Sequence, residues 1–415
     1  MTVSYVVVGA GQRGTSYAKW VGENPDRARV VGVAEPRAHQ RDGLAGRHTI
    51  PAERVFTTWQ ELAEAPRLAD AAIVATQDTD HVEPVISLAA KGYHLLVEKP
   101  LAPDEADCRR LVDAVRATGV LFAVCHVMRY RPYTRLLKEI VDSGRIGDVV
   151  SVQHLEPVGW WHQAHSFVRG NWRRADLASF MLLAKSCHDI DWLRHVVGRP
   201  IERVSSFGSL THFRREHQPA GAADRCLDCA VEPDCPYSAT RLYLGVVRTG
   251  HTGWPVSVIT DEPTEEGVLR ALRDGPYGRC VYACDNDVVD HQVVAMEFAG
   301  GRTATFTMTG FTPTSDRRTR IFGTRGSIDG DGEQLSVCDF VTGRTEELTV
   351  ASAGMDAAAG HGGGDDALMD AFTTAVATGD PAPILSGPAE SLETHLAVFA
   401  AERARCSGTV QRVIP

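Results

Sequence analysis

The chain has 415 residues, of which 43% are hydrophobic and 23% are charged, and its formal net charge is −10. This length favours two or three domains, and the acidic balance argues against nucleic acid as a partner, because phosphate binding needs a basic surface. No apolar run approaches the roughly eighteen residues of a membrane helix, so no membrane partner is expected. The N-terminus enters an apolar strand without a basic export signal, which predicts a cytoplasmic protein.

The N-terminal segment has the pattern of a dinucleotide-binding unit. An apolar strand leads into Gly9-x-Gly11-x-x-Gly14, a helical segment follows, and a second strand ends at Glu35. In this order the glycines allow a tight turn, close approach of a pyrophosphate and close helix packing, and the acid suits the ribose hydroxyls of NAD. Arg37 could hold a 2′-phosphate, so NADP remains the less favoured alternative.

Two later strands continue the predicted parallel sheet, and they end at Thr76 and at Glu98-Lys99-Pro100. Chemistry in doubly wound sheets lies beyond the carboxyl ends of the strands, so Lys99 is expected where a nicotinamide ring would lie. The proline after it is a candidate for a cis peptide bond. The predicted cofactor-binding residues are Gly9, Gly11, Gln12, Arg13, Gly14, Glu35, Arg37, Thr76, His81, Glu98 and Lys99.

The strand-end "EKP", followed by "CHVMRYRPYTRLLKEIVDSGRIGDVVSV" and a C-terminal "PAPILSGPAESLETHLAVFAAERARCSGTVQRV", resembles the glucose–fructose oxidoreductase / inositol dehydrogenase / MocA family. The resemblance implies an α/β protein. A Rossmann domain with a doubly wound parallel sheet is expected at residues 1–127, and an α+β domain with an open, mostly antiparallel sheet at 128–415. From about residue 365 the chain is expected to return to the Rossmann domain. The second domain would bind substrate and form a homodimer or homotetramer.

The segment "SFMLLAKSCHDIDWL", residues 179–193, predicts a helix. Leu183 and Cys187 recur at helical spacing and would face a core. Lys185 and His188 lie three apart on one side, where packing alone would favour apolar residues. This pattern predicts that one side of the helix lines a substrate cleft. The alternative is a structural histidine with a lysine that reaches solvent.

The family signature for this helix is roughly L-L-D-x-G-x-H-x-x-D. His188 matches its histidine and Asp191 its final acid, whereas Ala184 stands where the aspartate is usual. The family resemblance also implicates Lys99 in substrate binding and proton transfer. We predict that Lys99, His188 and Lys185 are catalytic, with either Lys99 or His188 as the base.

A carbohydrate-binding surface is predicted between a strand and this helix, where "EPVGWWHQAHSFVRGNWRR" concentrates tryptophan, histidine and arginine. Indole faces pack against the C–H faces of sugar rings, while histidine and arginine bond hydroxyls or anionic groups. The alternative is that the tryptophans cover a core or a subunit interface. The predicted substrate residues, two of them from the family's "RY.P" segment, are Arg129, Tyr130, Trp160, Trp161, His162, His165, Arg169 and Trp172.

A polar insertion contains Cys226-x2-Cys229-x5-Cys235, and Cys280 and Cys284 follow later. Three thiolates from one loop and a fourth from Cys280 or Cys284 suit a structural tetrahedral zinc site. Reduced thiols without metal are the alternative, because the spacing lacks a second CxxC pair. Further on, residues 288–311 alternate as a hairpin across Gly300-Gly301 and are expected in the open sheet.

The leading hypothesis is an NAD-dependent oxidoreductase that transfers hydride to or from a secondary hydroxyl of a sugar, glycoside or cyclitol. A redox-neutral, NAD-dependent glycosidase is the main alternative, because some relatives oxidise a glycoside transiently, eliminate, add water and reduce the product. A non-catalytic NAD-binding regulator is a third class, which the presence of both Lys99 and His188 disfavours.

Overall fold

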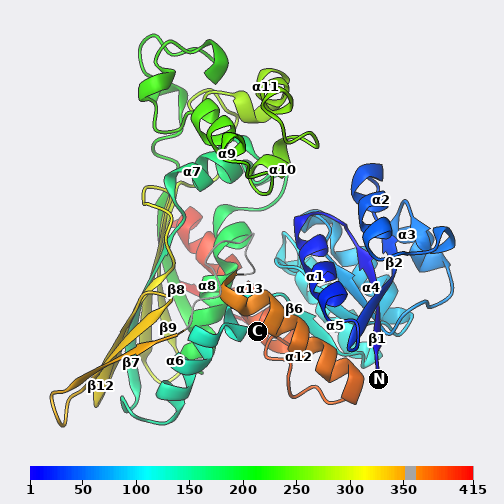
Figure 1. Ribbon diagram of the computed structural model, residues 1–415. Coiled ribbons are helices and arrows are strands. Elements are labelled where there is room, and N and C mark those ends of the chain that lie inside the picture. The colour runs from blue at the N-terminus through cyan, green and yellow to red at the C-terminus, as the bar shows by residue number, and fades with distance from the viewer. Residues whose placement is uncertain (351–360, 415) are drawn as a thin grey trace.

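The computed structural model describes residues 1–350 and 361–414, which form two sheet-containing parts and a helical insertion (Figure 1). In these ranges no helix is long and apolar enough to cross a membrane.

The first part is a six-stranded sheet in the order β3-β2-β1-β4-β5-β6, with all pairs parallel. Every residue of β1 is buried, as expected for a strand with both faces covered. The predicted doubly wound sheet is confirmed, and the strand order reverses between β1 and β4. Its strands are β1 (Val3–Val8), β2 (Ala28–Ala34), β3 (Val55–Phe56), β4 (Ala71–Val74), β5 (His94–Val97) and β6 (Phe122–Val124); its helices are α1 (Gln12–Glu23), α2 (Ala38–Arg47), α3 (Trp59–Glu64), α4 (Val82–Ala90) and α5 (Glu105–Thr118).

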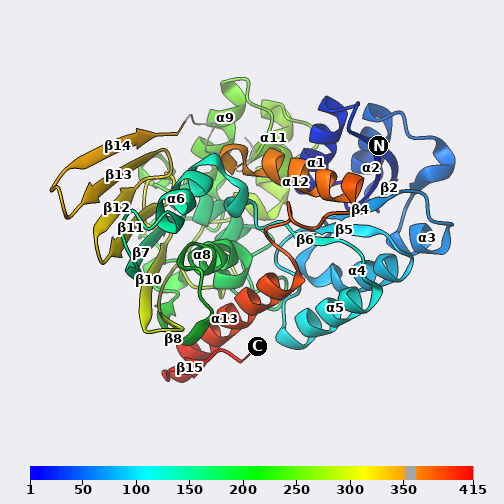
Figure 2. The same cartoon turned by 90° about the horizontal axis from the view of Figure 1, so that it is seen from below.

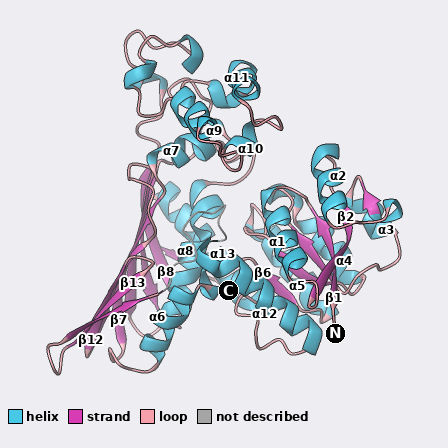
Figure 3. Ribbon diagram, viewed as in Figure 1, coloured by secondary structure: helices cyan, strands magenta, loops and turns pink. Residues whose placement is uncertain are grey.

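The second part is a separate sheet, drawn as the magenta strands on the left of Figure 3. Its nine strands have the order β14-β13-β12-β11-β7-β10-β9-β8-β15. Strands β7 and β10 pair in parallel and the other neighbours pair antiparallel, so the predicted mostly antiparallel sheet is confirmed. The expected hairpin is also confirmed, because Phe298 pairs with Arg302 across the glycine turn. The strands are β7 (Val149–Pro157), β8 (Ile201–Ser209), β9 (His291–Phe298), β10 (Arg302–Thr309), β11 (Arg318–Gly323), β12 (Gly326–Gly330), β13 (Gln334–Asp339), β14 (Thr345–Thr349) and β15 (Gln411–Arg412).

Helices cover one face of the second sheet (Figure 2). They are α6 (Pro132–Asp142), α8 (Met181–Val197) and α13 (Pro388–Ser407), of which α8 packs on β7 and β10, and α13 packs on β8. The predicted helix around residues 179–193 is therefore confirmed as α8. It is almost entirely buried and ends at Gly198, whose φ of 68° breaks the helix.

The C-terminal segment touches both parts of the molecule. Helix α12 (Gly364–Thr378) packs on α1 and β1, and the Tyr5 hydroxyl lies 2.8 Å from Thr373 Oγ1. Helix α13 then packs on α5 as well as on α8. A helical insertion stands beyond one end of the nine-stranded sheet (Figure 1). The short helix α7 (Trp160–His162) lies at the base of this insertion. The insertion itself contains α9 (Gly245–Arg248), α10 (Val256–Ile259) and α11 (Glu265–Asp274).

Candidate active site

A cleft of about 460 Å³ is formed by the two parts of the molecule. The Rossmann side contributes Thr76, after β4, and Lys99, after β5. The opposite side contributes Glu156 from the end of β7, and Lys185 and His188 from α8. The cleft therefore opens at the carboxyl ends of the parallel strands, beside the point where their order reverses, where ligands bind in such sheets.

The glycine turn beside the cleft is shaped for a dinucleotide. Gly9 has a φ of +89°, and a Cβ atom there would lie 2.5 Å from the Ala75 carbonyl oxygen. A Cβ atom on Gly14 would lie 2.0 Å from the Gly9 carbonyl oxygen. The N-terminus of α1 has no side-chain cap at Gly11, so its N–H groups remain available to a pyrophosphate. These residues fit the NAD that the motif predicts.

Glu35 follows β2 and is buried at the far side of this turn. Its Oε2 accepts a hydrogen bond of 2.9 Å from the Ala10 N–H, and its Oε1 accepts one of 2.8 Å from Arg37 Nε. Burial raises the pKa of Glu35, but the hydrogen bonds from Arg37 and Ala10 outweigh burial and leave the pKa below its usual value. A carboxylate thus stands where the ribose hydroxyls of NAD are expected, and Arg37 is paired with it.

Two predicted cofactor residues have side chains engaged within the protein. The Arg13 guanidinium forms an ion pair with Glu98 Oε1 at 2.6 Å and donates hydrogen bonds to both carboxylate oxygens of Asp365 from α12. Arg13 also lines the cleft, as does Gln12. His81 is fully buried, with Nδ1 2.7 Å from the Pro100 carbonyl oxygen, so it braces the chain around Lys99 rather than facing the cleft.

Lys99 reaches from the end of β5 to α8. The peptide bond between Lys99 and Pro100 is cis, as the sequence suggested. The Lys99 ammonium donates a hydrogen bond of 2.6 Å to the backbone carbonyl of Ala184. Ala184 is the position where the family signature usually has an aspartate, and here its main chain holds the lysine instead.

Lys185 points to a charged network that the sequence did not reveal. Its Nζ lies 3.1 Å from Glu156 Oε1, and Arg317 Nε lies 2.7 Å from Glu156 Oε2. Arg317 is also 2.8 Å from Asp189 Oδ1, whose other neighbour is His154 at 3.1 Å. Glu156, Lys185 and Arg317 all line the cleft, so this network forms one of its walls.

His188 and Asp191 of α8 lie in different surroundings. His188 lines the cleft with only 6% of its surface exposed, and its ring lies 6.0 Å from that of His126. Asp191 is fully buried and forms a two-point ion pair with Arg129, at 2.7 and 2.6 Å. Burial raises the pKa of Asp191, but Arg129 and His126 lower it to about 2. Asp191 therefore supports the fold beneath the cleft.

Several predicted substrate residues do not line the cleft. Arg129 is committed to Asp191, and the Tyr130 hydroxyl donates to or accepts from Ser386 at 3.0 Å in the interior. His165 Nδ1 lies 2.6 Å from the Tyr243 hydroxyl, so this imidazole belongs to a buried cluster. Trp160 is 39% exposed on the surface. The predicted residues that do line the cleft are Trp161, His162 and Trp172.

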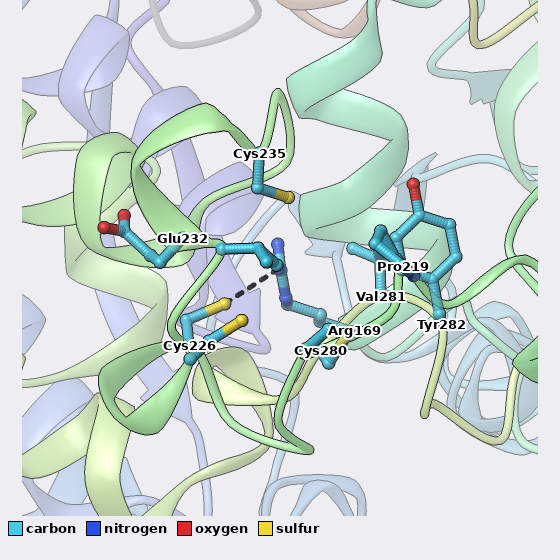
Figure 4. Close-up of a pocket in the computed structure, with 11 residues that line it drawn as sticks. Arg169, Pro219, Cys226, Glu232, Cys235, Cys280, Val281 and Tyr282 are labelled. Carbon is cyan, nitrogen blue, oxygen red and sulfur yellow. Dashed lines mark hydrogen bonds between the residues drawn. The ribbon is translucent and has the colours of Figure 1, made fainter.

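The zinc prediction is not supported. Cys226, Cys229, Cys235 and Cys280 do line one small pocket, but the guanidinium of Arg169 extends between them (Figure 4). Arg169 Nη2 donates to Cys226 Sγ at 3.6 Å and to the Tyr237 carbonyl at 2.7 Å, and Nε donates to the Arg279 carbonyl at 2.7 Å.

Across the part of the chain that the structure describes, no group of three histidine, cysteine or acidic residues is arranged to hold a metal ion, and Cys284 adds none. Burial raises the pKa values of the Cys235 and Cys280 thiols. Arg169 is buried among these cysteines with its guanidinium hydrogen-bonded to two backbone carbonyls, and it does not line the cleft.

Models of one protein family match most of the chain. The model described as "Oxidoreductase family, NAD-binding Rossmann fold" matches residues 3–126, and "Oxidoreductase family, C-terminal alpha/beta domain" matches residues 138–405. The chain belongs to the Gfo/Idh/MocA oxidoreductase family. Its first sheet is accordingly the family's NAD-binding domain.

Curated relatives of this family member resemble part of it. A 2,7-anhydro-N-acetylneuraminate hydratase of Escherichia coli is 28% identical over 51% of this chain and 54% of its own length. An inositol 2-dehydrogenase of Streptomyces avermitilis is 28% identical over 52% of this chain and 59% of its own length. The chain thus spans little more than half the length of these relatives.

Among solved structures, levoglucosan dehydrogenase in complex with NADH and levoglucosan has the same fold, with a TM-score of 0.71, 19% identity and full coverage of both chains.

Among the residues of the cleft wall that the sequence did not indicate are Glu156, Trp254 and Arg317. Glu156 had a usable signal, because it ends a strand immediately before the tryptophan-rich segment. Arg317 stands in the run "DRRTR", where nothing in the sequence distinguishes it from the exposed Arg318 and Arg320. Trp254 lies in the insertion, and no period or motif connects it with the Rossmann domain.

Proposed function

We propose that this protein transfers hydride between NAD and a secondary hydroxyl of a sugar, glycoside or cyclitol. The observation that carries the proposal is the position of Lys99. Its side chain extends from the end of β5 in the NAD-binding domain, and its Nζ donates to the Ala184 carbonyl of α8, inside the cleft that His188 also lines. Oxidation of an alcohol needs a group that accepts the hydroxyl proton, and a lysine in its neutral amine form or a histidine with a neutral imidazole can do so. NAD would supply the hydride acceptor.

The wall opposite the Rossmann domain is suited to hydroxyl groups. Burial, and then the charges of Lys185, His165 and Lys99, hold the pKa of His162 well below its usual value, so its imidazole is neutral. A neutral imidazole offers one donor and one acceptor. Lys185 and Arg317, both fixed by Glu156, add donors. We infer that Lys185 orients the substrate and that Lys99 or His188 exchanges the proton.

We expect NAD to be preferred to NADP, because Glu35 would accept hydrogen bonds from ribose hydroxyls and repel a 2′-phosphate. Glu35→Ala should weaken NAD binding roughly ten- to hundred-fold, the range for hydrogen bonds to a charged group. Calorimetric titration with NAD and NADP measures this. Asp42→Ala, an exposed acid on α2, is the control and should bind NAD normally. Unchanged NAD affinity in Glu35→Ala would place the ribose elsewhere.

A redox-neutral reaction is the second candidate, and one observation favours it. The site lacks the aspartate of the family signature at Ala184, and relatives in Escherichia coli and Mediterraneibacter gnavus are named as hydratases of an anhydro sugar. In this mode the same cleft would oxidise the sugar, eliminate, add water and reduce.

A panel of myo-inositol, levoglucosan and aryl glycosides with NAD separates the two, with NADH and released aglycone followed together. Accumulating NADH indicates a dehydrogenase, and aglycone release without net accumulation of NADH indicates the redox-neutral reaction. Neither signal with any compound would contradict both.

We also propose a homodimer or homotetramer. The face of the nine-stranded sheet away from α8 exposes apolar side chains from three strands, and an open sheet face of this kind favours association. They are Phe207, Val293 and Phe322, with exposed fractions of 70, 39 and 39%. Light scattering should give a mass of two or four chains, and Phe207→Glu should lower it; a monomeric wild type would refute the assembly.

A further inference from the structure

We propose that Trp254, in the helical insertion, is a specificity-determining residue whose indole face receives the ring of a cyclic polyol. This inference rests on the proposed function and adds a substrate class to it: pyranoses and cyclitols in preference to open-chain polyols.

Trp254 belongs to the cleft although it is far from the rest of the site in sequence. It lies just before α10 and is half-buried, and it lines the cleft together with Trp161 and Trp172. Its ring centroid is 4.9 Å from that of Trp161, with the two planes at 50°. The two indoles are therefore adjacent in the lining of the cleft, one from α7 and one from the insertion.

Three neighbouring rings fix the orientation of this indole. The ring centroid of His162 lies 5.2 Å from that of Trp254 with the planes at 77°, and that of His165 lies 5.4 Å away with the planes at 87°. His165 is itself held by the Tyr243 hydroxyl at 2.6 Å and by stacking on Tyr277 at 5.1 Å. An indole held by several rings loses little freedom when a ligand packs on it, which favours binding.

The indole also lies close to the charged groups of the site. His162, which contacts Trp254, is near enough to Lys185 and Lys99 for both charges to act on its imidazole. A cyclic polyol that rests its C–H face on Trp254 therefore has its hydroxyl edge among His162 and the two lysines. An open-chain polyol has no such face, so the Trp254 indole would favour cyclic polyols over open-chain ones by shape.

The insertion that carries Trp254 is firmly joined to the cleft. The helical segment Gln163–Arg169 contributes Ser166 and Phe167 to the lining of the cleft. Arg169 at its end donates hydrogen bonds to the Tyr237 and Arg279 carbonyls of the insertion. The buried Arg169 side chain thus ties the insertion that carries Trp254 to the wall of the cleft.

The test compares Trp254→Ala and Trp254→Phe with Trp160→Ala, a matched control that removes an exposed tryptophan outside the cleft. Steady-state constants are measured with NAD and with myo-inositol, levoglucosan and the open-chain glucitol, and binding of each polyol to the protein with NADH is measured by calorimetry. Trp254→Ala should raise the KM for the ring compound roughly ten- to hundred-fold, because it removes a stacking platform. The KM for NAD should stay within about twofold, Trp254→Phe should lose less, and Trp160→Ala should match the wild type.

The outcomes separate the two proposals. If the wild type turns over a ring compound and both Trp254 variants keep its KM, Trp254 does not contact substrate and only this inference is overturned. If both variants also lose NAD binding and their circular dichroism changes, the residue is structural, which likewise overturns it. If the wild type binds NAD but neither binds nor converts any polyol, the proposed function itself is wrong.

Discussion

Lys99→Met is expected to reduce turnover by roughly 10²–10⁴-fold, the usual contribution of a positioned acid or base. Methionine keeps much of the side-chain volume but cannot donate to the Ala184 carbonyl or exchange a proton. NAD binding should survive, because the glycine turn and Glu35 lie apart from the ammonium. Steady-state kinetics with the best compound of the panel, together with calorimetry of NAD binding, provides the measurement.

Two comparisons sharpen this result. Lys99→Arg keeps the charge but should be nearly as damaging, because arginine does not release its proton at neutral pH. Lys185→Met should lose less, since Lys185 is paired with Glu156 and is assigned only to orientation. Near-normal turnover in Lys99→Arg would show that charge alone matters and would refute proton transfer by Lys99.

Acidification from about pH 7 to pH 5 should lower the free energy of unfolding by roughly 1–2 kcal/mol for each of three buried histidines. Burial lowers the pKa of His126 and of His165 to about 3 and that of His395 to about 4. In the unfolded chain each imidazole binds a proton below about pH 6.5, and the folded protein does not follow until far lower pH. Stability is therefore lost as the pH falls from 6.5 towards 4.

Urea titrations at the two pH values test this sign. His126→Leu removes one titrating group from the interior, so its loss of stability between the two pH values should be smaller than that of the wild type. His217→Asn is the control, because His217 is exposed, and it should keep the full loss. A wild type more stable at pH 5 than at pH 7 would contradict the neutral state of these histidines.

The fold could be predicted because its signals are local. The strand–glycine–helix order around Gly9 and the alternation on both sides of Gly300 each specify an element and its neighbour. Lys99 was predictable for the same reason, since the end of a parallel strand has a fixed relation to the cofactor. Helix α8 followed from its apolar period.

The rest of the site depends on contacts that no spacing encodes. Glu156, Trp254 and Arg317 meet only after the second sheet and the insertion have folded. The zinc prediction is not supported for a related reason: the cysteines do converge on one pocket, but Arg169 from another segment extends among them. Likewise the Arg13 side chain is oriented by its hydrogen bonds to Asp365, a residue near the other end of the chain that no motif connects with it.

A single-turnover measurement of NADH fluorescence shows whether hydride passes to NAD in this cleft. The protein is mixed with an equal amount of NAD and each compound of the panel in turn. We predict an NADH signal with at least one cyclic polyol or glycoside, lasting for a dehydrogenase and transient for the redox-neutral reaction. In Lys99→Met the same signal should rise roughly 10²–10⁴-fold more slowly while NAD still binds. Conversion of a compound without NADH at any time would contradict hydride transfer to NAD, and an equally fast signal in Lys99→Met would contradict proton transfer by Lys99.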